Sequence, residues 1–199
     1  CTSGGAPLPA EVKDSFERLT GCVIVEGYGL TEASPVVTSS VATGAPFGSI
    51  GVPVAGLELR LVDEDGDDVL IGDSGELWVR GPNVFAGYWD DAEATAATVN
   101  DDGWLMTGDV GTVDDNGFLY LVDRVKDLII VSGFNVYPAE VEEVLMQHPG
   151  IDACAVVGVP HPYTGEAVKA YVVTVRGESV EEDDIVQFCA GRLARYKCP

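Results

Sequence analysis

One stretch, GYGLTEASP (residues 27–35), brings together residue types that could bind a nucleotide. It follows TGCVIVE, a short β-branched run that predicts a buried strand, so the stretch is expected to leave that strand's carboxyl end. Open α/β sheets bind their ligands at that edge. The ring of Tyr28 could stack on a base, the hydroxyl of Thr31 could bond a phosphate, and the carboxylate of Glu32 suits Mg²⁺. The alternative is an ordinary glycine-rich loop in which Thr31 caps a helix.

Two further segments carry polar side chains that suit a ribose or a phosphate. DGWLMTGD (102–109) ends in Asp109, whose carboxylate could accept hydrogen bonds from both hydroxyls of a ribose. VDRVKD (122–127) supplies Arg124, a donor for ribose or phosphate, and Lys126, which lies where the composition changes and a hinge could form. Taken one at a time, Asp109 could equally cap a tight turn, and the second segment could be a charged linker.

The composition narrows the function classes. The chain has 199 residues, is 46% hydrophobic and contains no apolar run long enough for a transmembrane helix. Its net charge of -22 argues against nucleic-acid binding and against a polybasic membrane anchor. This charge could keep the protein soluble by self-repulsion, or reflect a salt-rich or GC-rich source. Because it starts at Cys1 without Met and stops abruptly, we expect a fragment of a longer protein.

The five cysteines show neither a CxxC pair nor an even count. This pattern predicts buried thiols in a reducing cytoplasm rather than a disulfide framework or a zinc site.

Three regions of different patterning predict an α+β chain. Residues 1–40 indicate strand, helix and strand, with Val12, Phe16 and Leu19 on one helical face. Residues 46–124 alternate with period two between Asp-Gly and Asn-Gly turns, which predicts antiparallel hairpins in a small barrel or sandwich. From about residue 128, a β-α-β-β-α order predicts a small α+β domain.

In their order along the chain, several segments resemble the adenylate-forming superfamily of acyl-CoA synthetases, luciferases and nonribosomal adenylation domains. These segments are SGGAPL, GYGLTEASP, GELWVRGPNVFAGYW, DGWLMTGD and DRVKDLIIVSGFNVYPAEVE, and they cover nearly the whole chain. EGYGLTEASP and the block from DGWLMTGD to YPAEVE look most like bacterial long-chain fatty acid–CoA ligases.

The resemblance implies a domain organisation. Residues 1–125 would be the C-terminal part of the large AMP-binding domain, comprising the end of an α/β subdomain and an antiparallel β-barrel-like subdomain at 46–124. Residues 126–199 would be a truncated small C-terminal α+β domain.

The resemblance also implies a nucleotide site assembled from distant parts of the chain. Its expected members are Gly5, Ala6, Pro7 and Tyr28 for the adenine, Thr31 and Glu32 as catalytic residues at the phosphate and Mg²⁺, and Asp109 and Arg124 for the ribose.

Two half-reactions follow from the resemblance. A carboxylate would attack the α-phosphate of ATP to give acyl-adenylate and pyrophosphate, after which the CoA thiol would displace AMP. Between these steps the small domain would rotate about a hinge at Lys126, and Gly133 would border the pantetheine tunnel. The family's phosphate loop, most of its acyl pocket and its adenylate-contacting lysine have no match in residues 1–199, so we expect the isolated chain to be inactive.

The leading prediction is therefore a fragment of an ATP-dependent fatty acyl-CoA synthetase that uses a fatty acid, ATP, CoA and Mg²⁺. A short-chain or aryl acyl-CoA ligase and an acyl-AMP ligase are open alternatives. A nucleotide-binding module without catalysis and a plain structural domain are further ones. The enzyme is expected in the cytoplasm, where it could contact a membrane peripherally and form a homodimer.

Overall fold

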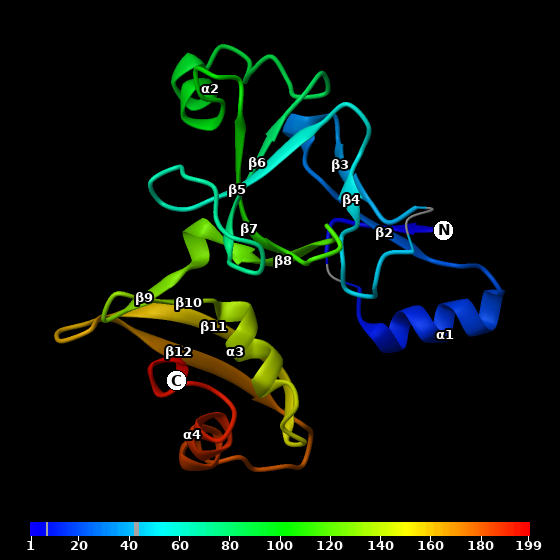
Figure 1. Ribbon diagram of the computed structural model, residues 1–199. Helices are drawn as coiled ribbons and strands as arrows, with labels where there is room; N and C mark the ends of the chain where they lie inside the picture. Colours follow the sequence, from blue (N-terminus) through cyan, green and yellow to red (C-terminus); the bar gives the residue numbers. More distant parts are fainter. Residues whose placement is uncertain (7, 42–43) are drawn as a thin grey trace. The chain divides into compact units, whose positions relative to one another are not determined.

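The computed structural model (Figure 1) divides into two units, Cys1–Leu121 and Val122–Pro199, whose positions relative to one another are not determined. It describes residues 1–6, 8–41 and 44–199. The predicted α+β class is confirmed, since both units combine helices with mainly antiparallel sheets. No helix in these described ranges is long and apolar enough to cross a bilayer.

The first sheet holds the segment that leads into the glycine-rich loop. Its strands, in spatial order, are β1 (Thr2–Ser3), β2 (Val25–Gly29), β3 (Val36–Ser39) and β4 (Val52–Pro53). β1 and β2 are parallel, so their carboxyl ends lie at the same edge, whereas β3 and β4 are antiparallel to their neighbours.

The helix predicted near the start of the chain is α1 (Ala10–Thr20), which connects β1 to β2. Its apolar face does not enter the core. No α1 residue is buried, and Val12 and Leu19 are 53% and 82% exposed. The periodicity therefore identified the helix correctly, but it did not show that the apolar face of α1 is exposed.

The second sheet confirms the predicted hairpins. Its strands are β5 (Glu58–Val62), β6 (Gly75–Arg80), β7 (Leu105–Val113) and β8 (Leu119–Arg124), in that spatial order, and the short helix α2 (Ala92–Thr98) lies between β6 and β7 in the chain. Within the described residues this is an open sheet, not the closed barrel that the alternation also allowed. A sheet of four short strands has too few strands to close on itself.

A shared core joins the two sheets of the first unit. Leu61, Leu77 and Leu105 of the second sheet pack in one buried cluster with Tyr28 and Val37 of the first. The loop that follows β2 is therefore anchored on both sheets.

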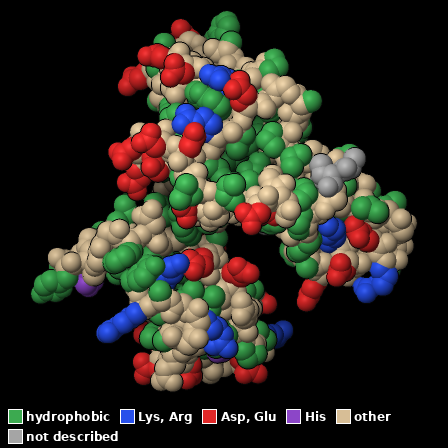
Figure 2. Space-filling view, in the orientation of Figure 1, with side chains coloured by type: hydrophobic (Ala, Val, Ile, Leu, Met, Phe, Trp, Pro, Cys, Tyr) green, Lys and Arg blue, Asp and Glu red, His purple; other side chains and the backbone are tan. Residues whose placement is uncertain are grey.

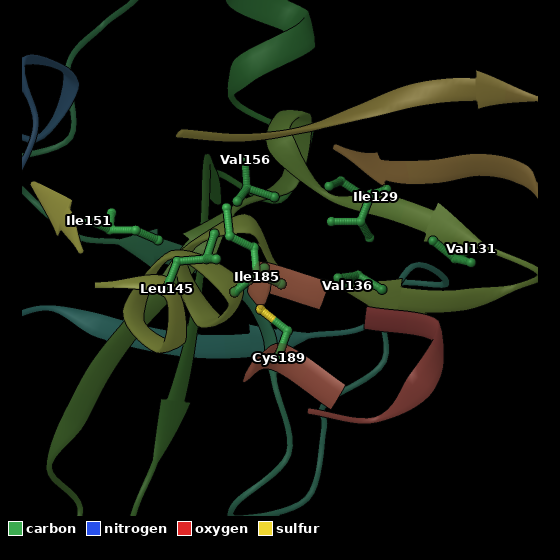
Figure 3. Packing of buried hydrophobic residues seen from close by; sticks show 10 residues of the cluster. Ile129, Val131, Val136, Leu145, Ile151, Val156, Ile185 and Cys189 are labelled. Atoms are coloured by element: carbon green, nitrogen blue, oxygen red, sulfur yellow. The ribbon is translucent and has the colours of Figure 1, made fainter. Parts of the chain in front are cut away.

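The second unit combines helices with a four-stranded sheet and starts at Val122, whereas the sequence predicts a domain boundary at residue 126. Its elements are η2 (Val125–Asp127), β9 (Ile129–Val131), β10 (Phe134–Val136), α3 (Pro138–Leu145), β11 (Ile151–His161), β12 (Gly165–Thr174), α4 (Glu182–Ala190) and η3 (Arg195–Lys197), with sheet order β10-β9-β12-β11. In Figure 3, Leu145 of α3 and Ile185 and Cys189 of α4 lie in one cluster with Ile129 and Val136 of the β9–β10 hairpin.

Acidic side chains are concentrated in surface loops. On the face shown in Figure 2, they gather over the loop between β5 and β6, whose residues 63–68 read DEDGDD. There the Asp63 side chain accepts hydrogen bonds at Oδ1 from the backbone N–H groups of Asp65 and Asp67, and this holds the loop.

The backbone of Pro35 lies so close to Gly29 that only glycine fits at this position. A Cβ at this position would lie 1.9 Å from the carbonyl oxygen of Pro35, which also accepts a 2.9 Å hydrogen bond from Leu30 N. Any larger residue must push β2 and the following turn away from β3.

We expect Gly29→Ala to destabilise the first unit by about 3 kcal/mol, because backbone atoms have to move. Gly191→Ala is the matched control. Its added Cβ would meet nothing closer than 3.8 Å, so its effect should stay below about 0.5 kcal/mol. All three tryptophans lie in residues 1–121, so tryptophan fluorescence during urea unfolding reports on the first unit, and far-UV circular dichroism follows the second unit, where Gly191 lies. Equal midpoints for parent and Gly29→Ala would contradict this packing.

The cysteines fall into two groups. Cys189 is buried and Cys154 and Cys198 are partly buried, as the pattern predicted, but Cys1 and Cys22 are exposed. Burial raises the pKa of the Cys154, Cys189 and Cys198 thiols. Their thiolate fraction near neutral pH is thereby reduced.

Alkylation should separate these groups. We expect iodoacetamide at about pH 8 to modify Cys1 and Cys22 roughly tenfold faster than Cys189. The raised pKa of the Cys189 thiol and its burial both reduce the amount of reactive thiolate. Peptide mass spectrometry of native protein after timed labelling measures the rates, and labelling in urea supplies the unfolded reference. Equal native rates would refute the assignment.

Candidate functional site

The glycine-rich turn after β1 lies beside the loop after β2. Because the two strands are parallel, Gly5 and Ala6 follow β1 at the edge where β2 ends with Tyr28 and Gly29. A Cβ on Gly4 would lie 3.1 Å from the carbonyl oxygen of Gly27, so the two backbones approach closely. Pro7, the third predicted adenine-lining residue, lies outside the described residues.

Tyr28 is a buried residue. Its side chain is 9% exposed and belongs to the core cluster, and its backbone N–H donates to Thr38 Oγ1 at 3.3 Å. Its hydroxyl donates to Asp109 Oδ2 at 2.5 Å. The structure thus brings together two predicted site residues from different sheets, although the flanking glycines do not leave the ring exposed. Adenine stacking by Tyr28 stays a prediction.

A β-bulge aims Asp109. The register of β6 with β7 shifts between Glu76 and Trp78, opposite Thr107, Gly108 and Asp109. Gly108 adopts φ +72°, which favours glycine. Thr107 Oγ1 donates to the Leu77 carbonyl at 2.8 Å and accepts from Asp109 N at 3.1 Å. Bulges commonly redirect a side chain next to a ligand site.

The 3₁₀ turn η1 (Thr31–Ala33) carries the predicted catalytic residues. Thr31 is exposed and Glu32 is half-buried. The residue before the turn is Leu30, and no side chain caps it, so the alternative in which Thr31 caps a helix is wrong. Glu32 Oε1 accepts a 2.7 Å hydrogen bond from the Tyr88 hydroxyl. That hydrogen bond, with a contribution from burial, raises the pKa of Tyr88.

The Asn83 side chain holds the same turn by hydrogen bonds to its backbone carbonyls. Its Nδ2 donates to the carbonyls of Ala33 at 2.7 Å and Val36 at 2.9 Å, spanning Ser34, which has φ +53°. Because both partners are acceptors, the amide nitrogen must face them, and this fixes the side-chain orientation. Asn83 Oδ1 is buried without a partner in the described part of the chain.

The sequence analysis did not single out Asn83 or Tyr88. Both lie in PNVFAGYW, directly after β6, which it used only for the resemblance. A polar amide and a tyrosine within an otherwise apolar loop were the available signal, but their partners are about fifty residues earlier in the chain.

The remaining predicted residues belong to the second unit. Arg124 ends β8, Lys126 lies in η2, and both are exposed. Gly133 forms the tight β9–β10 turn together with Ser132. Pairing of Arg124 with Asp109 at a ribose, the hinge role of Lys126 and the CoA contact of Gly133 all stay predictions.

A cavity of about 420 Å³ in the second unit borders η2 and α3. Several of its lining carboxylates are bound to backbone groups. Asp123 Oδ2 accepts from Ala139 N at the start of α3, and Glu142 and Glu166 accept from Val156 N and Ile130 N. The Asp123 and Glu166 carboxylates thus hold the start of α3 and β9, and Glu142 holds β11.

The basic side chains of the first unit are already engaged. Lys13, Arg60 and Arg80 form ion pairs with carboxylates, and Arg18 on α1 donates to Ser15. Among residues described up to Leu121, no other lysine or arginine occurs.

Comparison with known proteins connects this geometry to a family. Residues 1–89 match the family model of the AMP-binding enzymes, and residues 140–199 match that of the AMP-binding enzyme C-terminal domain. The chain belongs to the AMP-binding enzymes. The predicted resemblance to the adenylate-forming superfamily is thereby confirmed.

Individual relatives of this AMP-binding enzyme chain agree. A long-chain-fatty-acid–CoA ligase of Yersinia pestis is 48% identical over 202 residues, covering 98% of the chain and 35% of the ligase. A feruloyl-CoA synthase of Amycolatopsis is 46% identical over 199 residues, covering 98% of the chain and 40% of the synthase. The crystal structure of ATP-bound MatB from Rhodopseudomonas palustris matches with a TM-score of 0.90 and 40% identity, over 100% of this chain and 40% of that one. The chain thus spans little more than a third of these curated relatives.

The Tyr28–Asp109 hydrogen bond should be measurable in this AMP-binding enzyme chain. We expect a double-mutant cycle of Tyr28→Phe and Asp109→Ala to give a coupling energy of about 2 kcal/mol, because the hydrogen bond involves a charged acceptor. Unfolding in urea, followed by tryptophan fluorescence, supplies the four stabilities.

Tyr120 and Asp114 provide the matched control pair. The Tyr120 hydroxyl in β8 and the Asp114 carboxylate in the β7–β8 turn lie 3.3 Å apart, so Tyr120→Phe and Asp114→Ala should couple much more weakly. A Tyr28–Asp109 coupling no larger than that of the control would contradict its role in joining the sheets.

Proposed function

We propose that the chain is part of an ATP-dependent, AMP-forming fatty acyl-CoA synthetase. The observation that carries the proposal is the meeting of Tyr28 with Asp109 beside the Glu32 turn, in a chain that matches both AMP-binding family models. Tyr28 and Glu32 were predicted from one motif and Asp109 from another, and the fold brings Tyr28 and Asp109 into contact.

In the proposed first half-reaction, a carboxylate oxygen of the fatty acid attacks the α-phosphorus of ATP. The bond to the bridging oxygen breaks and pyrophosphate leaves, giving acyl-AMP. Thr31 would donate its exposed hydroxyl to a phosphate oxygen, and Asp109 would accept from the ribose. Such donors and acceptors act by being fixed before the reaction, which the η1 turn and the β7 bulge would ensure.

The residues around Glu32 fit a magnesium ion that arrives with the nucleotide. Within the described residues no group of three or more His, Cys, Asp or Glu side chains is placed to bind a metal ion. A single carboxylate is what Mg²⁺ commonly takes from a protein when phosphates supply its other ligands. Glu32 would hold the ion, which when bound neutralises negative charge on the phosphates.

In the proposed second half-reaction, the CoA sulfur attacks the acyl carbonyl carbon, its proton is released and AMP leaves. The second unit would reach this state by rotation at Lys126, in the exposed η2 turn between β8 and β9. Gly133, at the tip of the β9–β10 hairpin, would border the pantetheine path.

The acyl substrate is the finer part of the proposal. The long-chain ligase and the feruloyl-CoA synthase are almost equally similar, at 48% and 46% identity. We favour a fatty acid because the long-chain ligases come first among the relatives, and an aryl acid is the alternative. Competition between palmitate and ferulate for thioester formation by the full-length gene product distinguishes the two.

Two substitutions in the full-length gene product test the proposed reaction. Glu32→Ala should lower carboxylate-dependent ATP–pyrophosphate exchange by roughly 100-fold, because the metal–phosphate complex loses its protein ligand. Lys126→Pro should leave exchange close to the parent rate and abolish acyl-CoA formation, because a proline fixes the backbone at the hinge.

Glu11→Ala, an exposed carboxylate on α1, is the control for charge removal and should leave both steps unchanged. Absence of exchange in the parent would refute the synthetase proposal. Equal loss of exchange and thioester formation in Lys126→Pro would refute the hinge assignment alone.

A further inference from the structure

Glu32 is held by one short segment at both its backbone and its side chain. The Tyr88 hydroxyl donates to Glu32 Oε1 at 2.7 Å, and the backbone N–H of Phe85 donates to the Glu32 carbonyl at 2.8 Å. The two residues that hold Glu32 are three positions apart in the chain. This arrangement fixes the direction of the Glu32 side chain as well as the position of its backbone.

Tyr88 is itself fixed. Its ring contacts that of Phe85 edge-on, with centroids 4.9 Å apart and planes at 76°. Its backbone N–H donates to Thr95 Oγ1 at 2.9 Å, and the Thr95 hydroxyl donates to the Asp91 carbonyl at 2.7 Å in the first turn of α2. The hydroxyl of Tyr88 is therefore presented by a rigid ring with a helix behind it, although 39% of the residue is exposed.

This support has a chemical consequence for the carboxylate. A glutamate has three side-chain torsions, and ordering them when a ligand binds costs free energy. With Oε1 bound to Tyr88, that ordering precedes binding, and Oε2 is the oxygen without a hydrogen-bond partner among the described residues. A carboxylate prepared in this way offers one oxygen to a cation, which suits the strict octahedral geometry of Mg²⁺.

We propose that Tyr88 is a positioning residue that orients Glu32 toward the cation of a metal–ATP complex. The inference rests on the proposed function, since it assigns Glu32 to that metal. Partners that orient a metal ligand typically change metal affinity by roughly tenfold or more when removed.

Tyr88→Phe in the full-length gene product tests this role, because it removes one oxygen and keeps the ring. Mn²⁺ titrated with ATP in the absence of a carboxylic acid, and followed by electron paramagnetic resonance, measures metal binding without turnover. We expect roughly tenfold weaker Mn²⁺ binding, together with a roughly tenfold higher Mg²⁺ requirement for ATP–pyrophosphate exchange.

Three further variants make the test specific. Thr95→Val removes the hydroxyl that accepts from Tyr88 N and, like Tyr88→Phe, should weaken Mn²⁺ binding. In a Glu32→Gln background, Tyr88→Phe should add no further loss, because its effect passes through Glu32. Tyr120→Phe removes a hydroxyl that contacts Asp114, a different carboxylate, and should leave metal binding unchanged.

Unchanged Mn²⁺ affinity in Tyr88→Phe would overturn the positioning role, even if exchange became slower. An equal additional loss in the Glu32→Gln background would overturn it as well. If the parent protein shows neither exchange nor ATP-dependent Mn²⁺ binding, the proposed function fails together with this inference. Normal exchange in the parent with an unaltered metal requirement in Tyr88→Phe overturns the inference alone.

Discussion

The hydrogen bond from the Tyr28 hydroxyl to the Asp109 carboxylate is the interaction on which the site geometry depends. It links the end of β2 in one sheet to the bulge of β7 in the other, across 81 positions of sequence. The ring of Tyr28 supplies apolar area to the common core, and its hydroxyl supplies the polar contact that fixes how the two sheets meet. A residue of this kind serves packing and the site together, so the site cannot shift without disturbing the core.

The backbone around this hydrogen bond leaves little freedom. Gly29 is packed against the carbonyl of Pro35, and Asn83 binds the carbonyls on both sides of the following turn. The η1 turn that carries Glu32 is thus held by contacts from Pro35, at the start of the β3 segment, and from Asn83 in the loop after β6. Rigidity at this turn comes from tertiary contacts, which a local pattern cannot reveal.

This difference explains what the sequence could and could not predict. α1 was visible from apolar periodicity, α3 from the β-α-β-β-α order, and the hairpins from alternation and Asp-Gly turns. The β-α-β-β-α order also predicted α4, whereas α2 was missed although Asp91 caps it by accepting from Ala94 N. The motifs named Tyr28, Glu32 and Asp109, whereas the bulge at Gly108 and the partner Tyr88 required knowledge of contacts between distant segments.

The charge distribution ties these observations to a nucleotide ligand. With a net charge of -22, the chain repels polyanions, and the basic residues of the first unit are already paired or turned to other partners. In the proposed function, a cation that reduces the charge of the triphosphate would therefore favour its approach to Glu32. In the proposed function, the acidic surface would repel the bare nucleotide, and the pre-oriented Glu32 carboxylate would bind its metal complex.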